Sequence, residues 1–138
     1  MSDSKTKYYT FTGISRFSRL NTPDQYDNYS QKVEFVDSDE LYRYKASGIQ
    51  LTLDENAVFF KRPDSKIINK ELFNLGSPKV FIIDDDGKEV PFDGLIGGGS
   101  KVSVRVRAYP TQKGIGHTLD EVIVHELVPV ESGGRYGD

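Results

Sequence analysis

The stretch KVSVRVRAY, residues 101–109, decides the fold of this chain. Every second residue from Val102 to Ala108 is apolar, whereas the residues between them are basic, polar or aromatic. Because successive side chains of a β-strand point to opposite faces, this alternation predicts a strand with one face in a core. The other face carries Lys101, Arg105, Arg107 and Tyr109. Such a face suits a polyanion with flat bases, although an ordinary solvated strand has the same composition.

The flanking sequence predicts further short strands separated by turns. Strands are expected over residues 8–20, 30–36, 49–53, 57–62, 79–83 and 121–128. We expect the 49–53 and 57–62 strands to form a hairpin, and Gly13 to mark a bulge or bend in the first strand. Turns are expected at 84–87 and 97–99, a loop over 111–116, and short helical segments over 37–46 and around 70–75. Turn signals about every ten residues indicate a small barrel or sandwich.

The composition limits the classes of protein that the chain can represent. It has 138 residues, no cysteine, 18 basic and 21 acidic residues, and a net charge of −3. One domain over residues 1–130 is expected, followed by a disordered tail over 131–138. The polar N-terminus and the absence of a long apolar run predict neither a signal peptide nor a membrane span, so a cytoplasmic location is expected. The lack of a basic excess argues against wrapping of duplex DNA, but it leaves room for a local basic groove.

The segment AVFFKR, residues 57–62, supplies a second candidate surface. If Val58 and Phe60 face the core, Phe59 and Lys61 form an aromatic and cationic pair on the outside, of the kind that binds single strands. The alternative is a strand buried on both faces with a basic end. Arg62 extends the basic end of this strand.

Weaker candidates flank these two strands. Arg16, Phe17 and Arg19 lie in the first predicted strand, and Tyr26 and Tyr29 follow it. Loop tyrosines of this kind often only cover the edge of a core. Lys113 lies in a glycine-containing loop, where it could hold a phosphate.

Motifs for catalysis are not recognisable in the sequence. His117 and His125 lack metal-ligand spacing, and the Asp84–Gly87 segment fits a hairpin turn better than a calcium loop. The glycines 97–99 precede a strand rather than a helix, which argues against a phosphate loop. We therefore expect no enzyme activity, no metal and no cofactor. A metal-dependent hydrolase using the aspartates 84–86 remains a distant alternative.

Three segments together resemble a known family. They are VFIIDDDG (80–87), IGGGSKVSVRVRAYP (96–110) and KGIGHTLDEVIVHEL (113–127), and the upstream TPDQYDNYSQKVEF (22–35) and AVFFKRP (57–63) are compatible with them. They resemble the tailed-phage single-stranded DNA-binding replication proteins, which have an OB fold. The resemblance implies an all-β, OB-fold-like small antiparallel barrel with one or two short helices. It also implies binding of single-stranded DNA without strong sequence preference, protecting it during phage DNA replication and recombination.

The resemblance places the two candidate strands along one groove. The residues expected to bind single-stranded DNA are Phe59, Lys61, Arg62, Lys101, Arg105, Arg107, Tyr109 and Lys113. Replication proteins and further copies of the chain are candidate partners, but the C-terminal ESGGRYGD departs from the acidic tail with which the family recruits them. The alternative from another class is a β-sandwich virion or carbohydrate-binding module, with surface tyrosines as sugar platforms.

Overall fold

The structure, a computed structural model, describes residues 6–129. Its main element is a seven-stranded sheet in the order β3-β2-β1-β8-β9-β6-β7. The strands are β1 (Lys7–Arg19), β2 (Asn28–Glu34), β3 (Ala57–Pro63), β6 (Lys79–Ile83), β7 (Glu89–Pro91), β8 (Lys101–Thr111) and β9 (Gly114–Glu126). Neighbouring strands are antiparallel, except that β6 runs parallel to β9. The predicted tail over 131–138 lies outside the described residues.

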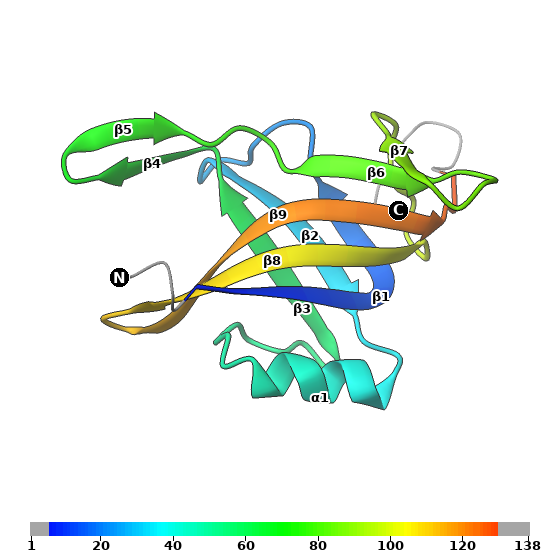
Figure 1. The fold of residues 1–138 in the computed structure, drawn as a ribbon, viewed down its shortest axis with the longest axis horizontal. Coiled ribbons are helices and arrows are strands. Elements are labelled where there is room, and N and C mark those ends of the chain that lie inside the picture. The colour runs from blue at the N-terminus through cyan, green and yellow to red at the C-terminus, as the bar shows by residue number, and fades with distance from the viewer. Residues whose placement is uncertain (1–5, 130–138) are drawn as a thin grey trace.

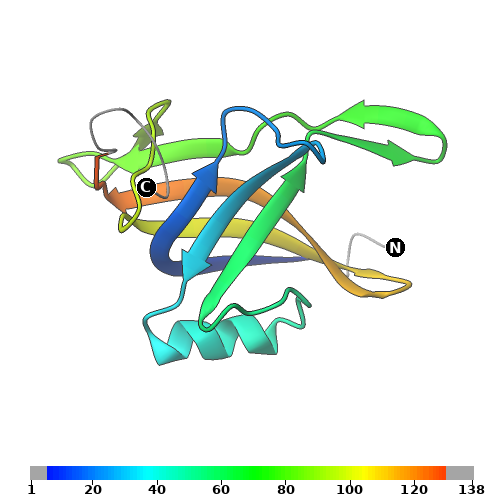
Figure 2. The same cartoon turned by 180° about the vertical axis from the view of Figure 1, so that it is seen from behind.

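The sheet curls into two walls that share β1. Residues 7–14 of β1 pair with β8, and residues 14–19 pair with β2. Figure 1 therefore shows β8 and β9 in front of β2 and β3, and Figure 2 shows the reverse. The first five strands of the order form an OB-like, partly open barrel, so the predicted all-β fold class is confirmed.

The space between the walls is filled by aromatic and branched side chains. Phe11, Phe35, Tyr44 and Phe60 lie with ring centroids 5.5–6.5 Å from one another. Tyr44 comes from the helix α1 (Ser38–Ala46), which lies across one end of the barrel in Figure 1. The Asp37 carboxylate caps this helix by accepting a hydrogen bond from the Asp39 N–H at 2.8 Å. The apolar face of β8 is buried as the alternation predicts.

A bulge in β1 turns its side chains at the point where the strand passes from one wall to the other. The register against β2 shifts between Ser15 and Phe17, which leaves Arg16 as the extra residue. The shift explains why Ser15 and Ser18, three residues apart, are both buried. Buried Gln31 accepts a hydrogen bond from the Ser18 hydroxyl at 2.6 Å and donates one to the Ser15 hydroxyl at 2.8 Å. The bulge thereby turns Phe17 toward the outside of the barrel.

Several predicted elements differ from the observed ones. Residues 49–53 do not form a strand but an irregular segment that packs on the core. The predicted hairpin of 49–53 with 57–62 is therefore wrong, and β3 pairs with β2 instead. The helical turn expected around 70–75 is wrong. Strand β5 (Glu71–Asn74) pairs there with β4 (Ser65–Ile68) as a separate hairpin, which projects from the barrel in Figures 1 and 2. The loop expected over 111–116 is also too long, because β8 and β9 extend to a turn at residues 112–113.

The turns expected at 84–87 and 97–99 are present. No helix within residues 6–129 is long and apolar enough to cross a membrane.

Candidate nucleic-acid interface

An aromatic and basic surface forms on the outside of β1, β2 and β3. The pairing of the three strands aligns their outward side chains in two neighbouring rows. We call this surface the β1–β2–β3 face, made of Phe17, Arg19, Ser30, Lys32, Phe59 and Lys61. It faces the viewer in Figure 2, where β2 and β3 are in front.

The first row consists of Phe17, Lys32 and Phe59, which lie opposite one another on successive strands. The Phe17 and Phe59 rings meet at an interplanar angle of 65°, with centroids 5.9 Å apart. The Lys32 ammonium lies 5.2 Å from the Phe59 centroid and 3.1 Å from the Asp54 carboxylate. Phe59 is 37% exposed, so part of this large apolar ring is open to a ligand. The exposed part of the Phe59 ring can stack on a base, whereas the Lys32 ammonium beside it is paired with the Asp54 carboxylate.

The second row consists of Arg19, Ser30 and Lys61. Arg19 and Lys61 are exposed on either side of buried Ser30, and Arg19 donates a hydrogen bond to the Pro23 carbonyl at 3.2 Å. Asp24, in the loop between β1 and β2, accepts hydrogen bonds from the Tyr26 and Asn28 amides. The Asn28 bond is the main cause of the lowered pKa of Asp24, and the positive charges of Arg19 and Lys61 lower it further.

The predicted arginines of β8 lie on the other wall and are occupied by carboxylates. Arg105 donates hydrogen bonds to Glu89 and to Glu121, each at 2.6 Å, and these bonds raise the pKa of Arg105. Arg107 is paired with Asp120 at 2.9 Å. The structure therefore does not place Arg105 and Arg107 beside Phe59 and Lys61, because β3 and β8 belong to opposite walls (Figures 1 and 2).

Tyr109 lies where the two walls approach each other. Its hydroxyl donates to the His117 carbonyl at 3.2 Å, and its ring lies 5.1 Å from the Lys66 ammonium. The His117 imidazole in turn accepts a hydrogen bond from the Lys61 amide at 3.0 Å. Tyr109 thus reaches the border of the β1–β2–β3 face near Lys61, through the seam between β9 and β3.

The remaining predicted residues have different settings. Arg62 is largely buried and donates hydrogen bonds to the carbonyls of Leu75, Gly76 and Leu119, so it ties the segment after β5 to β9. Lys113 is exposed in the turn between β8 and β9, and Lys101 is exposed at the start of β8.

Sequence reasoning missed Lys32 and ranked Phe17 and Arg19 below the β8 arginines. Lys32 has the same parity as Ser30 and Glu34, which marks the outward face of β2. This parity identifies Lys32 as a candidate binding residue only when β2 is known to lie between β1 and β3, because Lys32 then lies beside Phe17 and Phe59. The bulge at Arg16 also changes the parity of β1, so simple alternation along the strand does not place Phe17 and Arg19 on this face.

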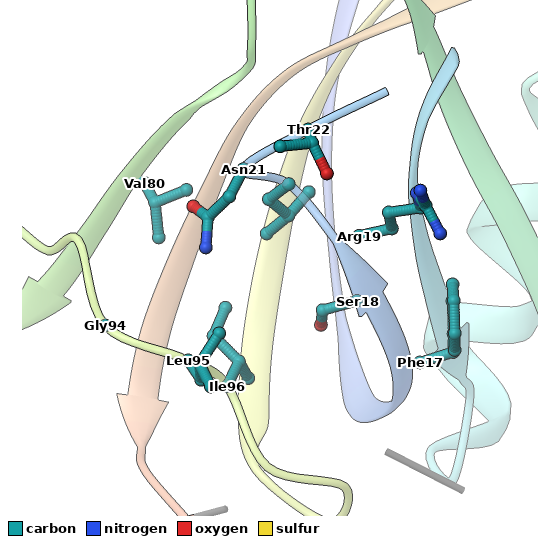
Figure 3. Close-up of a pocket in the computed structure, with 10 residues that line it drawn as sticks. Phe17, Ser18, Arg19, Asn21, Thr22, Val80, Gly94, Leu95 and Ile96 are labelled. Carbon is teal, nitrogen blue, oxygen red and sulfur yellow. The ribbon is translucent and has the colours of Figure 1, made fainter. Parts of the chain in front are cut away.

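A pocket adjoins the β1–β2–β3 face at the end of β1. It has a volume of about 270 Å³ and lies between that strand end, β6 and the segment before β8 (Figure 3). Its lining residues are Phe17, Ser18, Arg19, Leu20, Asn21, Thr22, Val80, Gly94, Leu95 and Ile96.

The catalytic alternative gains no support from the geometry of the aspartate turn. The Asp84 carboxylate accepts hydrogen bonds from the amides of Asp86 and Lys88, as in an ordinary hairpin turn. No group of three or more His, Cys, Asp or Glu side chains within residues 6–129 could hold a metal ion.

Solved structures with the same fold come from phage single-stranded DNA-binding proteins. The crystal structure of gp2.5, a single-stranded DNA-binding protein encoded by bacteriophage T7, matches with a TM-score of 0.59 and 18% identity, covering 88% of this chain and 93% of that chain. The single-stranded DNA-binding protein of bacteriophage Enc34, with a C-terminal truncation, matches with a TM-score of 0.54 and 14% identity. This match covers 89% of this chain and 87% of that chain. No family model and no curated protein matches the sequence. The chain therefore has the fold of these phage proteins, as the sequence resemblance predicts.

Proposed function

We propose that the chain binds single-stranded DNA on the β1–β2–β3 face. The observation that carries this proposal is the row of Phe17, Lys32 and Phe59 beside the row of Arg19 and Lys61. In OB folds, the corresponding strands and their adjoining loops form the surface that binds oligonucleotides. Both similar structures are of single-stranded DNA-binding proteins, which supports the same ligand class here.

The two rows perform different parts of the binding. The exposed ring of Phe59 stacks on a base, and Arg19 and Lys61 neutralise phosphates of the same strand. Since every base has a π-face and every nucleotide a phosphate, this combination binds without strong sequence preference. Phage replication and recombination expose single strands, and covering them is the role that fits such a face.

Only part of the residue set expected from the sequence belongs to this proposal. Phe59 and Lys61 lie in the β1–β2–β3 face, and Tyr109 lies at its border, where its hydroxyl contacts His117. Lys113 lies in the turn between β8 and β9, outside this face (Figure 2). Lys101, Arg105 and Arg107 lie on the wall of β8, outside the proposed path. Arg62 supports the face from within, through its bonds to three backbone carbonyls.

The proposal is tested by titrating a labelled dT oligonucleotide at several salt concentrations. Lys61→Ala should weaken binding and reduce the salt slope by about 0.7, the value for one single-strand phosphate. Phe59→Leu, which keeps an apolar group against Phe17, should weaken binding about fivefold or more with an unchanged slope, because stacking is uncharged.

Lys88→Ala is the matched control, because Lys88 is an exposed lysine in the turn between β6 and β7. It should leave affinity and slope unchanged. Absence of binding at low salt, or equal effects of Lys61→Ala and Lys88→Ala, would contradict the proposal. Binding of glycans without binding of oligonucleotides would instead favour the carbohydrate-binding alternative.

A further inference from the structure

We propose that the pocket at the end of β1 receives one nucleobase of the bound strand and that Asn21 contacts the edge of that base. This inference rests on the proposed function. The β1–β2–β3 face stacks on bases and neutralises phosphates without distinguishing one base from another. The pocket would add a site that recognises the identity of one base.

The pocket is continuous with the proposed path of the strand. Phe17 and Arg19 belong to both the β1–β2–β3 face and the pocket wall. A strand whose phosphate is held by Arg19 therefore has its next base at the mouth of the pocket. Figure 3 shows Phe17 and Arg19 on one side of this opening, and Val80 and the 94–96 segment on the other.

The lining suits a flat, largely apolar group. Leu20, Val80, Leu95 and Ile96 supply apolar walls, and Leu95 is 44% exposed beside buried Ile96. Among the described residues that line the pocket, Arg19 alone carries a charge. A phosphate would find one cation at the rim and apolar side chains inside, whereas a base would replace water along these walls.

The volume of the pocket limits what it can hold. At about 270 Å³ it lies just below the range of roughly 300–1,000 Å³ that is typical of sites for drug-sized ligands. One base fits this size better than a longer stretch of nucleic acid. The rest of the strand remains on the open face.

Asn21 supplies the polar group that distinguishes one base from another. In Figure 3 its amide lies between Val80 and the 94–96 segment, and it has no hydrogen-bond partner among the described residues. An asparagine amide offers one acceptor and two donors, the combination that pairs with N6 and N7 of adenine. Bases of unpaired strands expose these edges to side chains. We therefore expect a modest preference for adenine at one position of the bound strand.

The test compares oligonucleotides that differ at one base, so that the stacking of homopolymers does not interfere. A dT oligonucleotide with one internal dA should bind wild-type protein about fivefold or more tightly than its all-dT counterpart, in the register that places dA in the pocket. Asn21→Ala should remove this difference and leave the salt slope unchanged. The matched control is Asn56→Ala, an exposed asparagine in the turn before β3, which should keep the preference.

Methyl-labelled protein gives a second readout. Addition of either oligonucleotide should shift the NMR signals of Val80, Leu95 and Ile96. If both oligonucleotides bind with equal affinity and the salt slope responds to Lys61→Ala while these methyl signals stay in place, the base pocket is refuted and the proposed function stands. If neither oligonucleotide binds at low salt, both are refuted.

Discussion

At the scale of single residues, the pairing of each cation decides whether it is available to a polyanion. Arg105 is held between Glu89 and Glu121, and Arg107 is paired with Asp120. A phosphate would have to replace carboxylates that are already within hydrogen-bonding distance. Lys61 carries no such ion pair among the described residues, and its side chain is exposed.

Arg105→Ala should therefore leave the affinity for single-stranded DNA and its salt slope unchanged. The ion pairs it removes are partly exposed, so the loss of folding stability should be about 1 kcal/mol or less. The same salt titration used for Lys61→Ala measures the slope, and urea unfolding measures the stability. A decrease of the salt slope by about 0.7 would contradict this prediction, because it would show that Arg105 contacts a DNA phosphate.

At the scale of elements, β1 is the strand that organises the molecule. It forms part of both walls, and the bend between them requires a close approach to β2. A methyl group at Gly13 would lie 2.7 Å from Val33 Cγ1 and still closer to the Glu34 carbonyl oxygen. The bend thus depends on the absence of a side chain at this position.

Gly13→Ala should destabilise the fold by about 1–3 kcal/mol, because the added methyl group forces backbone and core to move apart. The control is Gly98→Ala, where nothing lies within 4 Å of the added methyl group, and its effect should be small. Urea unfolding of both variants measures the difference. Equal stability of the two would show that β2 yields easily at the bend.

Local patterns predicted the elements whose cause is local. The alternation of 101–109 gave a strand with a buried apolar face, and the cap-type residues before 38 gave the helix. The alternation of IQLTL at 49–53 was misleading, because Leu51 and Leu53 pack on the core without a partner strand. Residues 71–74 form a strand because Asn69 and Lys70 adopt positive φ angles and make a tight turn after β4.

The candidate site was only partly predictable, since it depends on which strands are neighbours. The parity of Phe59 and Lys61 was readable within one strand, and both lie on the outside as expected. The outward residues of β8 were equally readable, but their neutralisation depends on Glu89, Asp120 and Glu121 in other strands. Neither the pairing of β2 with β3 nor these ion pairs can be predicted from a single stretch of sequence, because each joins segments that are far apart in the chain.

At the scale of the whole molecule, a histidine side chain of β9 forms a hydrogen bond with the backbone of β3. His117 accepts the Lys61 amide hydrogen bond through Nε2, so this nitrogen must carry no proton. Burial, together with the nearby charge of Lys61, lowers the pKa of His117 to about 4 from its ordinary value of 6.5. The neutral form of His117 is therefore the one that makes this contact between β9 and β3.

Stability should consequently fall as the pH decreases from about 6.5 to about 4. In this window the unfolded chain binds a proton at His117 that the folded chain does not, so the free energy of unfolding drops by up to about 1.4 kcal/mol per pH unit. Urea unfolding at several pH values measures the slope. His117→Gln removes the titrating group, and its slope should be shallower than that of the wild type. Identical slopes would exclude His117 as the cause.

The bend at Gly13 also bears on how distant relatives of this chain can be found. Core positions filled by Val or Phe accept other apolar residues of similar volume, so they diverge freely and overall similarity fades. A position that excludes even a methyl group has no such freedom. Glycine at 13, small hydroxyl residues at 15 and 18, and an amide at 31 therefore form a spacing signature of this corner. Searching for that signature should identify diverged chains that keep the same bend when whole-sequence comparison no longer does.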